Sequence, residues 1–297
     1  MTAMGTTTDD LDRDAGAPRE ARGRKALRRF LRRPGAVAGT VVIAAFVIIA
    51  ILAPVLAPYE PQAMTYTSIE VPPGPEHWFG TDDLGRDVLS RVLHGARISL
   101  QVGLIAVGIA MTTGSLLGLL AGFLGGWWDS VIMRTMDVML AFPGILLALA
   151  IVAILGPGLF NTMIAVGVAA IPVYARTARA STLSVLELDY VIAARALGAR
   201  WPRIAFIYVL PNITAPIIVL ATVGVATAIL SAAGLSYLGL GAQPPTPEWG
   251  AMLSDARSYL RSAWWMATFP GLAIMLVVMG FNLLGDGLRD VLDPRSR

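Results

Sequence analysis

The chain has 297 residues, of which 56% are hydrophobic and only 14% are charged. A soluble domain carries about 25% charged residues, so this composition excludes a protein whose whole surface lies in water. The absence of cysteine excludes disulfides, thiolate metal ligands and a cysteine nucleophile. The two histidines, His77 and His94, have no second histidine close to them in sequence, so we expect no zinc site.

Positive charge is concentrated at the N-terminus. Residues 1–33 carry nine of the 23 Lys and Arg residues. Such a cluster before a membrane helix is typical of a topology signal, and recognition of nucleic acid or lipid is the alternative. We interpret residues 1–33 as a disordered segment followed by a basic cytoplasmic tail that contacts membrane lipid and not nucleic acid.

The first long apolar run, residues 35–57, follows directly. As a helix it extends about 34 Å, which is enough for the ~30 Å hydrocarbon layer. It is too long for the core of a secretory signal, so we predict an uncleaved span. Residues 34–97 then comprise this span and an extracytoplasmic segment that ends in the run Asp82 to Arg91. The four-residue spacing of charges in that run predicts a solvated helix face rather than a ligand site.

Residues 98–288 contain the remaining apolar runs and form a predicted five-helix core. The runs are residues 98–123, 131–155, 159–174, 206–230 and 263–284. The first of them carries regularly spaced glycines, which predict a close helix-packing face. In the second, Arg134 and Asp137 lie one turn apart and predict either a local ion pair or a gate in the pathway.

Six spans put both termini on one side of the membrane. By this topology 18 of the 23 Lys and Arg residues face one side and five face the other. The excess of positive charge marks the cytoplasmic side, so we predict cytoplasmic termini, with residues 289–297 as a short tail. Residues 58–97 and 236–262 then lie outside. The fold class is all-α, polytopic, with six transmembrane helices.

A polar, arginine-bearing segment separates the fourth and fifth apolar runs. Residues 181–205 keep a helical spacing of apolar side chains, Gly198 predicts a helix stop, and Trp201-Pro202 predicts a second short helix. The small residues Ala193, Ala194 and Gly198 would let the groove of another protein approach the backbone. A stiff connector with no partner is the alternative.

Five residues of this region resemble the coupling motif of ABC-importer permeases: Ala193, Ala194, Gly198, Leu210 and Pro211. The chain departs from that motif at Ile192, where the family has glutamate, and at Tyr208, where histidine is common. Residues 77–97, 234–245 and 282–295 further resemble the second, C-type permease of dipeptide and oligopeptide importers. The resemblance covers residues 34–297.

The resemblance implies a type I ABC-importer permease fold in a bacterial cytoplasmic (inner) membrane. It implies a heterodimer with a second permease, two ATPase subunits and an extracytoplasmic substrate-binding protein. The implied ATPase-coupling residues are Asp189, Ala193, Ala194, Arg195, Gly198, Leu210 and Pro211.

The chain has no G-x-x-x-x-G-K-[ST] motif, so we expect no ATP binding, no catalytic residue and no cofactor here; ATP and Mg²⁺ would be used by the partner ATPases. Transport of another solute (a nickel chelate, glutathione or haem), an ion-coupled carrier and a membrane-anchored scaffold remain as alternatives.

Overall fold

The computed structural model describes residues 28–292, and the rest of the chain, including most of the predicted basic tail, lies outside the described residues. The described part is helical, with one isolated β-bridge between Thr81 and Asp87. Its elements are α3 (Pro34–Leu56), α4 (Val88–Leu124), α5 (Gly126–Leu140), α6 (Gly144–Leu155), α7 (Leu159–Leu186), α8 (Asp189–Ala196), α9 (Trp201–Arg203), the π-helix η1 (Ile204–Val209), α10 (Leu210–Tyr237), α11 (Trp249–Ala256), the 3₁₀-helix η2 (Arg257–Tyr259) and α12 (Trp265–Leu292).

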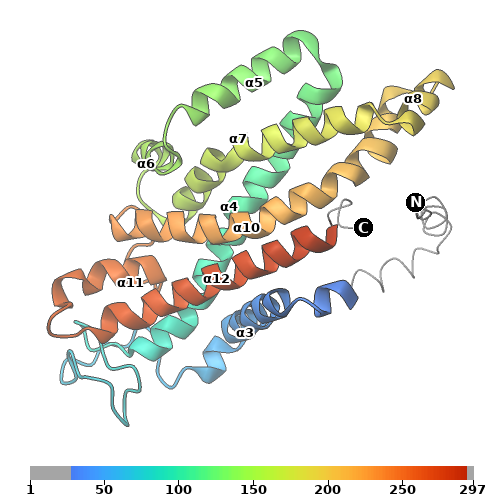
Figure 1. Ribbon diagram of the computed structural model, residues 1–297. Helices are drawn as coiled ribbons and strands as arrows, with labels where there is room; N and C mark the ends of the chain where they lie inside the picture. Colours follow the sequence, from blue (N-terminus) through green and yellow to red (C-terminus); the bar gives the residue numbers. More distant parts are fainter. Residues whose placement is uncertain (1–27, 293–297) are drawn as a thin grey trace, which may run out of the picture.

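Five helices within residues 28–292 are long and apolar enough to cross a membrane, and α5 with α6 makes a sixth if this bent pair is one span. The start of α3, the end of α12 and helix α8 lie at one end of the bundle, and α11 with the long loop before α4 lies at the other (Figure 1). This arrangement agrees with the predicted topology. At the first end, Arg33 pairs with Asp290 at 2.9 Å.

The sequence predicts one apolar span over residues 131–155, and in the structure this run is divided between two helices. Helix α5 ends at Leu140, α6 begins at Gly144, and the two axes differ by 93°. Pro143 disfavours the helical conformation of Phe142 before it and has no N–H to donate, so the helix stops there.

Helix α7 continues beyond its predicted end at residue 174 as far as Leu186. The added turns carry Arg176 and Arg179. Their charge is unfavourable in a membrane span, so the sequence predicts an earlier end. Both guanidinium groups find a carboxylate on α5, as described below.

Helices α4 and α7 pack closely along the predicted glycine face. A Cβ atom on Gly118 would lie 2.2 Å from the carbonyl oxygen of Ala175, and one on Gly114 would lie 2.7 Å from that of Ile171. The glycines therefore let the two backbones meet, which confirms their packing role. Gly108 is the exception, because nothing lies within 4 Å of its Cβ position.

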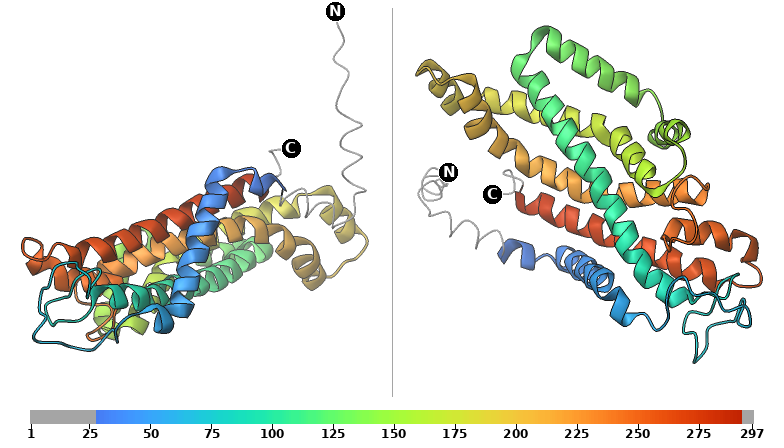
Figure 2. Two further views of the ribbon diagram at one scale, coloured as in Figure 1. Left: turned by 90° about the horizontal axis from the view of Figure 1, so that it is seen from below. Right: turned by 180° about the vertical axis from the view of Figure 1, so that it is seen from behind.

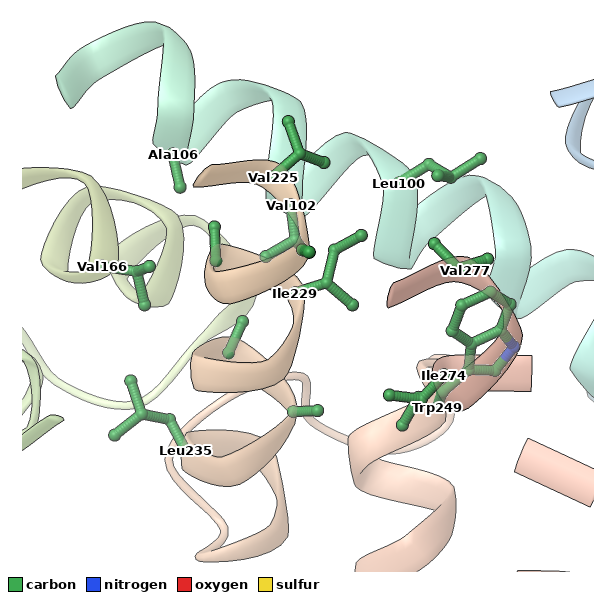
Figure 3. Packing of buried hydrophobic residues seen from close by; sticks show 14 of the residues in the cluster. Leu100, Val102, Ala106, Val166, Val225, Ile229, Leu235, Trp249, Ile274 and Val277 are labelled. Atoms are coloured by element: carbon green, nitrogen blue, oxygen red, sulfur yellow. The ribbon is translucent and has the colours of Figure 1, made fainter. Parts of the chain in front are cut away.

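The main core lies where α4, α7, α10, α11 and α12 meet (Figure 3). Its side chains include Val102 of α4, Ile229 of α10 and Trp249 of α11, all buried. Helix α4 runs the length of the bundle across α10 and α12, while α3 lies at the edge beside α12 (Figure 2, right).

Candidate functional site

Helix α8 stands at the cytoplasmic end of the bundle and contains most of the predicted coupling residues. Asp189 lies in its first turn and Arg195 in its last, so each charge complements the helix dipole. The helix ends at Ala196, and Gly198 adopts a positive φ of 83°, which a side chain would strain. The predicted helix stop at Gly198 is therefore confirmed, as is a second helix beginning at Trp201.

Two contacts attach α8 to the membrane helices. The side chain of Val191 is fully buried in a small apolar cluster that contains Val185, Ile204, Val209 and Ile213. The Nδ2 atom of Asn212 on α10 donates to the hydroxyl oxygen of Tyr190 on α8 at 3.2 Å. A displacement of α8 would thus be transmitted directly to α10.

The outward side of α8 and Leu197 directly after it expose apolar and small side chains beside the charged Asp189 and Arg195. The side chain of Leu197 is 90% exposed, Ile192 and Ala193 are exposed, and Ala194 is half-buried. Leu210 and Pro211 are exposed in the first turn of α10. An apolar, small-residue face on a polar segment is typical of a surface covered by a partner.

The turn before Pro211 is wider than an α-helix. Residues Ile204–Val209 form a π-helix that joins α9 to α10 without a break. In a regular α-helix the ring of Pro211 would meet the carbonyl group of Ile207, and the wider turn relieves that clash.

Sequence reasoning missed the role of Asn212. Its place in a glycosylation-like Asn-Ile-Thr sequence suggested no function, yet it donates to both Tyr190 and the carbonyl oxygen of Tyr208. The signal available in the sequence is its position directly after Leu210-Pro211.

At the other end of the bundle, residues 57–87 and 238–264 form what we call the outer cap. A buried ion network holds it together: Arg86 Nε lies 2.6 Å from Asp82 Oδ2, and Arg91 Nε lies 3.5 Å from the same oxygen. Arg91 also donates to the carbonyl oxygens of Pro61 and Pro245. The prediction of a solvated helix face here is wrong, because these side chains are buried and α4 begins only at Val88.

Further polar contacts join the outer cap to the helices. The carboxylate of Asp87 accepts from Ser90 and contacts His77 Nδ1 at 2.9 Å. The indole N–H of Trp265 donates to the carbonyl oxygen of Thr81 at 2.9 Å. These bonds fix residues 57–87 against the outer ends of α4 and α12.

Glu248 caps the N-terminus of α11 from a buried position. Its carboxylate accepts from the backbone N–H groups of Gly250 and Ala251, both at 2.9 Å, while the side chain is only 3% exposed. Burial raises the pKa of Glu248, and the two backbone bonds partly oppose that rise. Burial likewise raises the pKa values of Asp83 and Asp255 in the same cap.

Two ion pairs join α5 to α7 nearer the cytoplasmic side. Asp137 Oδ1 lies 2.5 Å from Arg176 Nη2, and Asp129 accepts two bonds from Arg179 at 2.5 and 2.6 Å. The sequence predicts Arg134 as the partner of Asp137. Among the described residues, Asp137 forms an ion pair with Arg176 and none with Arg134. The packing of α7 against α5 brings Arg176 to Asp137, and the spacing of these residues in the sequence gives no indication of that contact.

An apolar cavity of about 360 Å³ lies among α4, α6, α7 and α10. Its walls are mostly small residues, such as Ala148, Ala170 and Gly224, with Thr227 and Ser231 as polar groups. Tyr174, which donates to the carbonyl oxygen of Leu220 at 3.5 Å, also lines it. Such walls leave room among the helices and offer no charge that would hold a solute firmly.

Together, the helix bundle, the anchored cytoplasmic helix and the outer cap define a multi-pass membrane transport subunit. A family model for the binding-protein-dependent transport system inner membrane component matches residues 114–297. A second model, for the N-terminal transmembrane domain of oligopeptide transport permease C, matches residues 22–73. The chain therefore belongs to this family of ABC-importer permeases, in its oligopeptide C-type branch, and is a multi-pass protein of the bacterial inner membrane.

Curated relatives are similar over nearly their whole length. The dipeptide transport system permease protein DppC of Alkalihalophilus pseudofirmus is 50% identical over 92% of this chain and 90% of that protein. The di/tripeptide transport system permease protein DppC of Pseudomonas aeruginosa is 51% identical over 90% of each chain. The glutathione transport system permease protein GsiD of Escherichia coli is 50% identical over 91% of this chain and 89% of that protein.

Among solved structures, a chain of the MetNI methionine ABC transporter, in inward-facing conformations, is similar. The match covers 68% of this chain and 97% of the MetNI chain, with a TM-score of 0.56 and 20% sequence identity. This likeness establishes the type I importer fold and, at that identity, nothing about the solute.

Proposed function

We propose that this chain forms half of the pathway through which an ATP-driven importer carries di- and oligopeptides into the cytoplasm. Membership of the permease family supports the transport role. The dipeptide and di/tripeptide permeases among its relatives support the choice of solute. The other half of the pathway is a homologous second permease.

The observation that carries the coupling role is the anchored, exposed helix α8. Its outer face presents Leu197 and Ala193 to a partner, while Val191 and Tyr190 attach it to the membrane helices. Two ATPase subunits, which bind ATP and Mg²⁺, would hold this helix in a groove and move it as they close. The motion would pass to α7 and α10, between which α8 is connected in the chain.

The outer cap is the proposed docking surface for an extracytoplasmic binding protein. Its buried ion network makes it a rigid platform on the outer ends of α4 and α12. A rigid surface loses little conformational entropy on docking, which favours association.

The solute and the energy source are tested together in proteoliposomes. The permease pair, its ATPases and the neighbouring binding protein are reconstituted, and uptake of labelled dipeptide, tetrapeptide and glutathione is measured. We expect peptide uptake that requires ATP on the side of the membrane where the ATPase subunits lie. This uptake should not respond to an ion gradient. Uptake driven by a proton or sodium gradient alone contradicts the proposal, and uptake of glutathione only would reassign the solute.

A substitution at Gly198 tests the coupling surface. Gly198→Trp places bulk where an ATPase groove would close, so we expect normal insertion, ATP hydrolysis that no longer responds to binding protein, and loss of transport. Gly198→Ala is the matched control, because it introduces the same strain at positive φ, about 1–2 kcal/mol, without the bulk. Normal transport by the tryptophan variant contradicts the assigned contact.

A further inference from the structure

We propose that Arg176 and Asp137 form a site in the pathway that binds the ionised ends of a peptide, with Arg176 binding the terminal carboxylate and Asp137 the terminal ammonium group. The inference rests on the proposed function in one respect, that the solute is a peptide. It assigns to these two residues the recognition of a substrate's charge.

The first argument is the exposure of the pair near the cytoplasmic side of α5 and α7. The side chains of Arg176 and Asp137 are 52% and 53% exposed. Arg176 lies just beyond the predicted end of the apolar span at residue 174, in the part of α7 that continues to Leu186. Half-exposed charges at this level are costly against lipid and face water or another protein. We therefore place the pathway on this side of α5 and α7.

The second argument is the space in front of the pair. An open depression of about 340 Å³ is lined by Met133, Asp137, Arg176 and Arg179. One helical turn along α7, Val173 lines the separate apolar cavity, so α7 borders both. A solute that passes the small-residue walls next meets the two charges. Small-molecule sites occupy roughly 300–1,000 Å³, so this space accommodates a short peptide.

The third argument is the balance of charge. A zwitterionic peptide can replace the Arg176–Asp137 contact with two equivalent contacts, guanidinium to carboxylate and carboxylate to ammonium. Each protein charge has a partner of opposite sign both before and after the peptide binds, so the exchange has a small net free energy. Weak, reversible binding of this kind is what a passage requires.

The neighbouring pair Asp129–Arg179 has the same chemistry and a different setting. It makes two hydrogen bonds instead of one, and its side chains are less exposed. A bidentate contact is held more firmly and is a structural link between α5 and α7. Asp129→Asn therefore serves as a matched control for Asp137→Asn.

The first experiment measures uptake by the complete transporter of three dipeptides: free, C-amidated and N-acetylated. For Arg176→Gln we expect the apparent KM of the free dipeptide to rise about tenfold, the effect of one lost charge-assisted bond, with little change for the C-amide. For Asp137→Asn we expect the same rise for the free dipeptide and little change for the N-acetyl form. Asp129→Asn should lower the amount of assembled transporter and affect all three peptides alike.

Two outcomes overturn the site. They are unchanged KM values in both variants, and equal losses for all three peptides. Failure of the proposed function looks different, because the wild-type transporter would then take up no peptide with ATP.

A second experiment tests whether peptide reaches this side of α7. It is used if a variant fails to assemble or the binding protein rejects the blocked peptides. The chain contains no cysteine, so a single introduced thiol can be identified on it by mass. In inverted vesicles, a charged membrane-impermeant thiol reagent should label Val173→Cys, and excess dipeptide should slow that labelling at least threefold. Ile48→Cys, which is somewhat more exposed than Val173 and lies on the peripheral helix α3, should remain unlabelled. Equal labelling of both thiols, no labelling of Val173→Cys, or labelling indifferent to peptide contradicts the proposal.

Discussion

At the scale of single residues, environment decides what one residue type does. Gly118 and Gly108 belong to the same helix and the same sequence pattern, yet only Gly118 touches a neighbouring backbone. Glu248 is an acid on the outer side of the membrane, yet it is buried and bonded to two backbone N–H groups. Neither difference follows from the residue type.

The two glycines provide a matched pair of substitutions. Gly118→Ala forces α4 from α7, because the new methyl group meets the carbonyl oxygen of Ala175, and we expect a loss of about 1–3 kcal/mol. Gly108→Ala adds a methyl group in open space and should be neutral or slightly stabilising, by up to ~1 kcal/mol. Thermal unfolding of the purified transporter in detergent measures both. Equal midpoints for the two variants would contradict the packing assigned to Gly118.

Glu248 predicts a pH dependence of stability. Its pKa is raised in the folded chain, so its stabilising contribution is fully present below the pKa of the unfolded state and is lost as pH rises through the folded pKa. We expect the thermal midpoint of the wild type to fall between pH 5 and pH 8 by more than that of Glu248→Gln, which cannot ionise. A larger fall in the glutamine variant would show that the carboxylate is stabilised by its partners instead.

At the scale of elements, the contacts between helices matter more than the helices themselves. Helix α8 has only eight residues and would not be stable alone. It is ordered by Val191 in its apolar cluster and by the bond between Tyr190 and Asn212. That bond crosses from the coupling surface to the first turn of α10.

Breaking this bond should uncouple the transporter. For Asn212→Ala and Tyr190→Phe we expect ATP hydrolysis to continue, peptide transport to fall several-fold, and amide exchange in α8 to accelerate. The double variant should be no worse than either single one, because both remove the same bond. Additive losses would show that the effect does not come from this bond. Thr214→Val, an exposed change two residues further along α10, is the control.

At the scale of the whole molecule, the outer cap connects segments that are far apart in sequence. Arg86 contacts Asp82 and Asp83 in the loop before α4, and Asp255 in α11. One buried guanidinium group thus joins the loop before α4 to α11. Removing it leaves the buried carboxylate of Asp82 without the partner that lies nearest to it.

Arg86→Gln should therefore open the outer cap. We expect a loss of roughly 3–5 kcal/mol, the usual effect of breaking a buried pair, with faster proteolysis within residues 57–87 and weaker docking of the binding protein. Arg261→Gln, an exposed change in the same cap, should alter none of these. Proteolysis from the outer face of right-side-out vesicles is the measurement, and an unchanged pattern in Arg86→Gln would show that the network is dispensable.

Patterns that depend on local sequence were predictable. The apolar runs, the excess of positive charge on one side, the glycine face of α4 and the helix stop at Gly198 all follow from residues close together in the chain. The sequence did not decide between a kink and a full break at residues 141–143, because a proline within an apolar run permits either, and neighbouring helices decide between them. The partner of Asp137 was missed, because Arg176 is distant in sequence.

Composition and short motifs were enough to indicate that most of this protein lies in lipid, on which side of the membrane each loop lies, and to which family the chain belongs. These properties depend on residues that are close together in the chain. The folded arrangement was needed to show which charges are buried, which carboxylate each arginine contacts, and which side of α8 remains exposed. Those properties depend on distances between segments that the chain brings together by packing, and sequence spacing does not encode them directly.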